Sequence, residues 1–247
     1  MQAELTPGEV VLVGGGPGDP DLLTVAALRA LRQADVIVHD RLGANAALAD
    51  VSTETELISV GKIPRGPFTP QEDINALLID LARKGLRVVR LKGGDNYVFG
   101  RGGEEWLACA EAGIPVRVIP GVTSAVSVPA LAGIPVTHRG LTQGFTVVSG
   151  HVPPGDPRCT LDWAALAASG TTLVLLMAVK NLPQIAAALM EAGLDAATPA
   201  AVVADGSTAA QATWRAPLAD IAAVAASAGV APPAIVVIGE VAGLSLG

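Results

Sequence analysis

Residues 90–105 combine many glycines with many charged side chains: five glycines, three cations and three acids follow an apolar run. Open α/β sheets bind ligands at the carboxyl ends of their strands, and glycines let backbone amides and carbonyls approach a ligand closely. The next apolar run leads into Pro-Gly-Val-Thr-Ser at residues 120–124. An N-cap explains one of the hydroxyl groups of Thr123 and Ser124 but not both. These two segments predict a site for a small polar ligand.

A further glycine-rich turn, residues 14–19, follows the first apolar run. A dinucleotide-binding turn needs a third Gly or Ala for close packing of helix and strand, and Asp19 stands there instead. Asp40, at the end of the next apolar run, could still imitate the acid that binds a ribose. Nicotinamide binding is therefore a disfavoured alternative, and a tight turn without a ligand is another.

The sequence lacks the motifs of several other activities. Lys62 follows a glycine but precedes Ile63, so it does not belong to a phosphate-binding P-loop. Three histidines and two cysteines show no metal-binding spacing, so we expect no metal. Aromatic residues make up 3% and the net charge is −7, which argues against nucleic-acid binding. No segment has the pattern of a leader or a membrane span, so we expect a cytoplasmic protein that does not bind membranes.

The cations are unevenly distributed along the chain. Thirteen of the 16 Lys and Arg residues lie at or before Arg139. The later part carries few charges, and such a surface favours contact between subunits. We expect the first part to hold an anionic ligand.

Short β-branched runs alternate with segments of helical periodicity, which predicts an α/β fold. The expected strands are 10–13, 36–39, 57–60, 87–91 and 116–119, then 145–149, 172–177, 200–203, 211–214 and 234–238. The connection before 211–214 is too short for a helical crossover, so that end of the second sheet should be antiparallel. We expect two α/β domains, 1–141 with a mostly parallel sheet and 142–247 with a mixed sheet, and a ligand cleft between them.

Taken together, the motifs closely resemble those of the tetrapyrrole methylase family. The resemblance covers nearly the whole chain and is carried by residues 11–20, 34–42, 70–75, 88–105, 119–125 and 133–139. The segments Asp40-Arg41-Leu42 and Phe99-Gly100-Arg101 favour the branch that acts first on uroporphyrinogen III. A methylase of a later precorrin is the nearest alternative, and a tetrapyrrole-binding protein without activity is another.

The resemblance implies a homodimer that uses S-adenosyl-L-methionine and releases S-adenosyl-L-homocysteine. It implies methylation of uroporphyrinogen III at C2 and C7, which gives precorrin-1 and then precorrin-2 for sirohaem and cobalamin synthesis. The cofactor residues implied by position are Pro17, Gly93, Gly94, Asp95, Val98, Thr123, Ser124, Met177 and Gly206.

The resemblance also implies catalytic roles: Asp40 would be the base and Lys62 a proton donor. Asp40 could instead pair with Arg41 or cap a turn, and Lys62 could instead bind a substrate carboxylate. Arginine suits carboxylates because its planar fork binds both oxygens. The residues implied to bind the substrate are Arg41, Arg65, Lys92, Arg101 and Arg139, and each could instead be a solvated surface charge.

This chain departs from the family pattern in several places. Asn96-Tyr97 stands where Pro-Phe is common, which should loosen that turn. Residues 62–68 also differ, at Ile63 and Pro67, within the loop that the resemblance implies to contact the substrate. Met177 could instead be an ordinary residue of the hydrophobic core.

Overall fold

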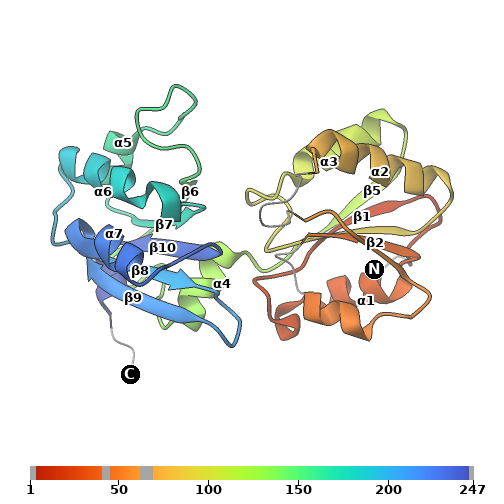
Figure 1. The fold of residues 1–247 in the computed structure, drawn as a ribbon, viewed down its shortest axis with the longest axis horizontal. Helices are drawn as coiled ribbons and strands as arrows, with labels where there is room; N and C mark the ends of the chain where they lie inside the picture. The colour runs from red at the N-terminus through yellow and green to blue at the C-terminus, as the bar shows by residue number, and fades with distance from the viewer. Residues whose placement is uncertain (1–3, 41–44, 62–68, 245–247) are drawn as a thin grey trace. The chain divides into compact units, whose positions relative to one another are not determined.

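The computed structural model describes residues 4–40, 45–61 and 69–244. It consists of two compact units, Met1–Thr123 and Ser124–Gly247, each built on its own five-stranded sheet (Figure 1). The division lies earlier in the chain than the predicted boundary after residue 141. The reason is helix α4 (Ser124–Leu131), which packs on β7 (Thr172–Leu176) and β10 (Ala234–Ile238) of the second sheet.

The sheet of the first unit is parallel throughout. Its strands are β1 (Val10–Gly14), β2 (Val36–His39), β3 (Glu56–Ser59), β4 (Val88–Lys92) and β5 (Val116–Ile119). They lie in the order β3-β2-β4-β1-β5, and every neighbouring pair is parallel. All five predicted strands of this unit are present.

Alternating side chains of β1 divide the core of the first unit into two layers. Val11 and Val13 pack with α1 (Val25–Gln33) on one face, whereas Val10 and Leu12 pack with α2 (Gln71–Arg83) and α3 (Gly102–Glu111) on the other. Figure 1 shows α1 below this sheet and α2 and α3 above it. Because both faces are covered, β1 is buried over its whole length, as expected for a parallel sheet.

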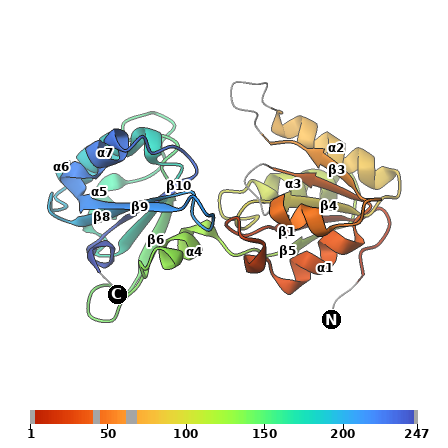
Figure 2. The same ribbon diagram turned by 60° about the horizontal axis from the view of Figure 1, so that its bottom comes forward.

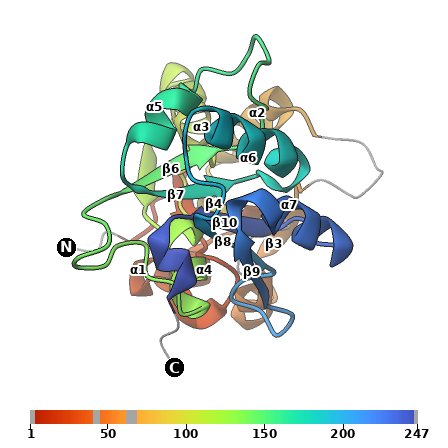
Figure 3. The same ribbon diagram turned by 90° about the vertical axis from the view of Figure 1, so that its left-hand side faces the viewer.

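The sheet of the second unit is mixed. It adds β6 (Phe145–Ser149), β8 (Pro199–Ala204) and β9 (Ala212–Pro217), and its order is β6-β7-β10-β8-β9, which can be followed in Figure 3. Only the β6–β7 pair is parallel among these described strands. The predicted antiparallel end is confirmed, since β8 pairs with β9.

Three helices cover one face of the second sheet. They are α5 (Trp163–Ala168), α6 (Leu182–Glu191) and α7 (Leu218–Ser227), which share a core with Leu173, Leu175 and Val236. Helix α4 packs on the opposite face (Figure 2). Within the described ranges, no helix is both long enough and apolar enough to cross a membrane.

Candidate active site

The predicted ligand-binding segments of the first unit lie at one edge of its sheet. Pro17 follows β1, Asp40 follows β2, the turn Gly93–Asp95 follows β4, and Thr123 follows β5. These strands are parallel neighbours, so their carboxyl ends meet at the same edge. In open α/β folds this edge is where ligands bind.

Glycines hold the ends of β1 and β4 together. The Gly15 amide donates to the Lys92 carbonyl at 2.7 Å, and Gly94 and Gly16 exchange hydrogen bonds at 2.7 and 3.1 Å. Gly94 has a φ of +65°, a conformation that suits glycine. A Cβ on Gly14 would lie 2.5 Å from the Cα of Gly121, so the loop after β5 also touches this backbone. The three segments form one closely packed platform.

Asp95 joins the loops after β4 and β5. Its Oδ1 accepts from the Tyr97 amide at 2.8 Å, and its Oδ2 accepts from the Gly121 amide at 3.0 Å. A carboxylate has more acceptor sites than these two amides fill, so Asp95 can still accept a hydrogen bond from a ligand.

Asn96 ties the same loop to the sheet. Its buried Nδ2 donates to the carbonyls of Leu12 at 3.3 Å and Ile119 at 3.0 Å. The expectation that Asn96 loosens the turn is therefore wrong, because its amide replaces the rigidity of a proline with hydrogen bonds to β1 and β5.

Asp40 forms an ion pair that the sequence did not reveal. Its Oδ1 accepts from Arg90 Nη2 at 2.7 Å, and its Oδ2 lies 4.0 Å from Lys92 Nζ. The side chain of Asp40 is 29% exposed, whereas that of Arg90 is 2% exposed. Arg41, the partner considered as an alternative, lies outside the described residues, as do Lys62 and Arg65.

Lys92 lies in a buried network with Glu105. Its Nζ donates to Glu105 Oε1 at 2.9 Å, and Arg90 Nε donates to the same oxygen at 3.0 Å. Burial lowers the pKa of Lys92, and the charge of Arg90 adds to this effect. The prediction of Lys92 as a carboxylate-binding residue does not fit this position, because its ammonium is buried and already paired.

The two other predicted cations that lie within the described residues, Arg101 and Arg139, are accessible. Arg101 is exposed, precedes α3 with a φ of +60°, and pairs with Glu104 through two hydrogen bonds of 2.8 and 2.7 Å. Arg139 is exposed and belongs to the second unit. Val98 is half-buried in the loop before Arg101.

Met177 and Gly206 follow β7 and β8 in the second unit. Both strands run antiparallel to β10, so their carboxyl ends share one edge. Met177 is 48% exposed with a φ of +56°, which excludes the alternative of a core residue. A Cβ on Gly206 would lie 2.6 Å from Val128 Cγ2. The close packing of this loop against α4 thus explains why a glycine stands at position 206. Ser124 is the first residue of that helix.

Left-handed backbone conformations occur in the loops that follow these strands. The non-glycine examples in the described ranges are Phe99, Arg101, Met177, Asp205 and Ser207. They lie after β4, β7 and β8. Such conformations cost free energy and concentrate at binding and active sites.

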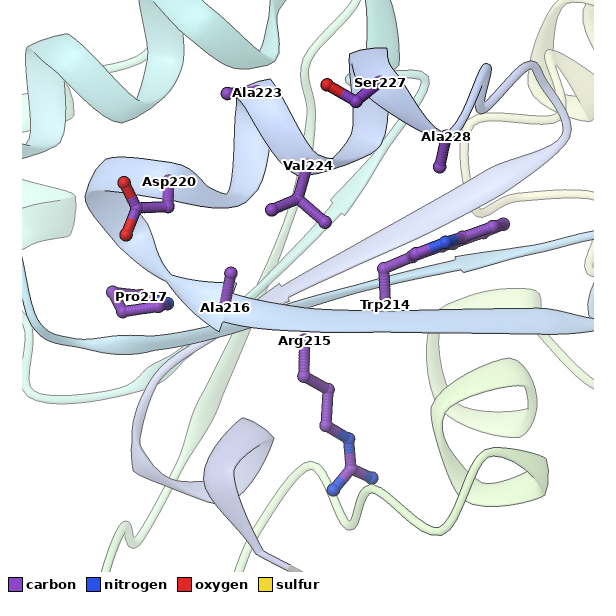
Figure 4. A pocket seen from close by; sticks show the side chains of 9 residues that line it. All are labelled: Trp214, Arg215, Ala216, Pro217, Asp220, Ala223, Val224, Ser227 and Ala228. Carbon is purple, nitrogen blue, oxygen red and sulfur yellow. The ribbon is translucent and has the colours of Figure 1, made fainter.

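An open groove lies elsewhere in the second unit, between β9 and α7. Trp214, Ala216 and Val224 supply its apolar part, with Asp220 at its border, whereas the Arg215 side chain points to the other face of β9 (Figure 4). None of the predicted site residues lines this groove.

The glycine turn after β1 does not lead directly into a helix N-terminus. Asp19 Oδ1 caps the short 3-10 turn Pro20–Leu22, and α1 begins only at Val25. A dinucleotide-binding turn places its helix immediately after the glycines. This geometry argues against the nicotinamide alternative.

Two α/β units, the first with glycine-rich loops at the carboxyl edge of its parallel sheet, are typical of a class of ligand-binding α/β enzymes. The family description "Tetrapyrrole (Corrin/Porphyrin) Methylases" matches residues 9–222. The chain therefore belongs to the tetrapyrrole methylase family, and it is an enzyme of the methylase class.

Individual relatives agree with this assignment. The siroheme synthase of Pseudomonas putida (strain W619) is 48% identical over 95% of this chain, which corresponds to 50% of that protein. The chain thus spans about half the length of the curated relatives it matches. The uroporphyrin-III C-methyl transferase of Thermus thermophilus, solved with S-adenyl homocysteine, is 41% identical, with a TM-score of 0.79 over 94% of this chain and 92% of that one. A cobalt precorrin-4 methyltransferase is 25% identical, with a TM-score of 0.84 over 95% and 96% of the two chains. The expected fold class and family are confirmed.

Proposed function

We propose that this chain transfers methyl groups from S-adenosyl-L-methionine to uroporphyrinogen III at C2 and C7, giving precorrin-2 through precorrin-1. The observation that carries this proposal is the placement of Asp40 and the Gly93–Asp95 turn at one sheet edge. The identity of 41% to the Thermus thermophilus transferase, over 94% of the chain, supports the choice of reaction. Precorrin-2 would serve sirohaem and cobalamin synthesis, in the cytoplasm and in a homodimeric enzyme.

The bound cofactor supplies an activated methyl group on a sulfonium, which the electron-rich pyrrole carbon attacks. The platform formed by the segments after β1, β4 and β5, together with Gly93, suits the close approach of a polar cofactor to backbone groups. Asp95 is placed to accept from its hydroxyl or amino groups. Precise alignment of the reacting atoms can supply several kcal/mol of the rate enhancement. Met177 and Gly206, in the second unit, are assigned to the cofactor on the resemblance.

Asp40 is the proposed base. A carbon–carbon bond forms as the sulfur–carbon bond breaks, and the macrocycle must then release a proton. Arg90 holds Oδ1 of Asp40, which leaves Oδ2 to accept that proton. Lys62 is proposed either as the proton donor or as a partner of a substrate carboxylate.

The substrate is polyanionic, and arginine side chains are proposed to bind its carboxylates. Arg101 and Arg139 are exposed and fit this task. Exchange of Glu104 for a substrate carboxylate would leave Arg101 in an equivalent bidentate pair. Arg41 and Arg65 complete the proposed set.

The test is anaerobic turnover of uroporphyrinogen III with methyl-labelled S-adenosyl-L-methionine, followed by mass spectrometry. Two labelled methyl groups in the product are expected. No methyl transfer to uroporphyrinogen III, combined with methylation of a later precorrin, would move the chain to another branch of the family.

A matched pair of variants tests the base. Asp40→Asn should lower turnover by about a hundredfold while leaving cofactor affinity nearly unchanged. Asp35→Asn is the control, because Asp35 pairs with Arg87, the residue before β4, at the opposite end of β2 from Asp40. Equal loss of turnover and cofactor affinity in Asp40→Asn would contradict the role of a base.

A further inference from the structure

Glu105 of α3 lies at the centre of a buried hydrogen-bond network. Its Oε1 accepts from Arg90 Nε at 3.0 Å, Lys92 Nζ at 2.9 Å and Gln71 Nε2 at 3.2 Å. These donors come from β4 and α2. Its Oε2 is buried and makes no hydrogen bond to any residue that the structure describes. The carboxylate thus uses one oxygen for three donors.

The network reaches solvent at Asp40. The exposed fractions of the side chains are 0% for Glu105, 2% for Arg90 and 4% for Lys92, against 29% for Asp40. Two carboxylates face two cations, so the formal charges of the network cancel. The arrangement connects the buried face of α3 with one accessible carboxylate at the ligand-binding edge.

Stability alone does not account for Glu105. Removing charges from water costs several kcal/mol per ion, and apolar side chains of similar volume often serve a core equally well. An oxygen without a partner adds to this cost. What Glu105 does provide is a fixed position and a fixed charge for the side chains that it binds, Arg90 and Lys92.

We propose that Glu105 is a positioning residue that acts on Asp40 through Arg90 and Lys92. This inference rests on the proposed role of Asp40 as the base. Glu105 fixes the plane of the Arg90 guanidinium at Nε, and Nη1 donates to the carbonyls of Val38 at 3.3 Å and Leu91 at 3.2 Å. Nη2 is then left in one orientation toward Asp40 Oδ1.

Glu105 also offsets the repulsion between the neighbouring positive charges of Arg90 and Lys92. Burial and the charge of Arg90 lower the pKa of Lys92, whereas the charge and hydrogen bond of Glu105 raise it. Among the residues that the structure describes, the ionisable groups around Asp40 are Arg90 and Lys92 from β4, Glu105 from α3 behind them, and His39, whose Nδ1 lies 3.3 Å from the Asp40 carbonyl oxygen. The neighbouring side chain from α2, Gln71, is uncharged. Without Glu105, Asp40 would be the one carboxylate left to balance the two buried cations within the described ranges.

The test is a double-mutant cycle on the full chain with Glu105→Gln and Lys92→Met. Glu105→Gln keeps the shape and one acceptor but leaves an excess positive charge. We expect kcat to fall about tenfold and KM for S-adenosyl-L-methionine to change less than about twofold. The double variant removes one charge of each sign. It should recover at least about threefold in kcat over Glu105→Gln. Glu111→Gln, exposed at the end of the same helix, is the control.

A second readout does not depend on turnover. NMR titration of the Lys92 side chain should show a lower pKa in Glu105→Gln than in the unaltered chain. An unchanged pKa of Lys92, or wild-type kcat in Glu105→Gln, would overturn the proposal. So would a loss of kcat that tracks the melting temperature and is not recovered in the double variant.

If the proposed reaction itself is wrong, the measurements will give a different pattern. The unaltered chain and all variants would then be equally inactive on uroporphyrinogen III, and the Lys92 titration would still decide whether Glu105 controls the network. If Glu105→Gln does not fold, comparison of the double variant with Lys92→Met gives the effect of Glu105 on kcat. An equal kcat in those two variants, with Asp40 intact, would then overturn the proposal.

Discussion

The carboxylate of Asp95 holds the backbone amide of Gly121, with 3.0 Å between Oδ2 and the amide nitrogen. One side chain thereby joins two loops that follow different strands of the sheet, β4 and β5. Its other oxygen holds the Tyr97 amide at 2.8 Å. Asp95 therefore shapes the proposed cofactor site before any ligand arrives.

Asp95→Ala should weaken cofactor binding more than a loss of one ligand contact would. Both amides lose their acceptor, so the loops lose their connection as well. We expect the dissociation constant for S-adenosyl-L-methionine to rise at least about tenfold, since each charge-assisted hydrogen bond contributes about 1.5 to 3 kcal/mol. Isothermal titration calorimetry measures this change. Asp80→Ala, on the exposed side of α2, is the control, and an unchanged affinity in Asp95→Ala would contradict this role.

Gly94→Ala and Gly85→Ala form a matched pair, because both glycines have a positive φ, +65° and +79°. The backbone cost of a side chain, about 1 kcal/mol, should be similar at the two positions. Gly85 follows the C-cap residue of α2, and a Cβ there would meet no atom within 4 Å. Only Gly94→Ala should therefore weaken cofactor binding, as measured by calorimetry. Similar affinities in the two variants would remove Gly94 from the site.

Gly206→Ala should destabilise the second unit through a clash with α4. The added Cβ would meet both methyl groups of Val128, which is 4% exposed. Overpacking of this kind costs about 1 to 3 kcal/mol. Val128→Ala alone should also destabilise, by loss of buried methyl groups. The double variant should be more stable than the sum of the two changes predicts, as measured by urea unfolding. Strict additivity would show that the two positions do not interact.

Cys109 should make the first unit sensitive to alkali. Burial raises the pKa of its thiol from 9.0 to about 11, and the charge of Glu105 adds to the rise. In the unfolded chain the thiol ionises at the lower pH, so the folded state binds more protons between these values. Stability must then fall as the pH rises through that window, by at most about 2 to 3 kcal/mol.

Urea unfolding at neutral pH and near pH 10 checks this expectation. Cys109→Ala should show a smaller decline between the two conditions, whatever its stability at neutral pH. Cys159→Ala is the control, because Cys159 is only half-buried in the second unit. A decline of equal size in the Cys109→Ala variant would rule out this thiol as the cause.

The elements of the fold follow largely from local patterns in the sequence. Apolar β-branched runs alternate with helical periodicity, and the short connection before β9 predicts its antiparallel pairing with β8. The position of β10 between β7 and β8 could not be predicted in this way. Pairing of strands that are distant in the sequence depends on how whole faces pack, and no local pattern encodes it.

The sequence predicted the glycines and Asp40 as residues of the candidate site, but it did not predict Arg90 and Glu105. Charged residues in a glycine-rich segment suggest an exposed loop, and both side chains are buried. One signal was present, since Arg90 stands between Val89 and Leu91 in a strand with two covered faces. A cation at such a position requires a buried partner. Which acid supplies that partner depends on the packing of α3 on the sheet.

The interior position of β1 constrains the order in which the first unit can assemble. β1 pairs with β4 on one side and β5 on the other, and both partners come late in this unit's sequence. During synthesis, β2 and β3 can pair early, while β1 has no partner strand until β4 has left the ribosome and has only one until β5 follows. Such distant pairings make folding slow and expose apolar strands in the meantime. We therefore expect the sheet of the first unit to be completed late, and the strand that is made first to be among the last to be enclosed.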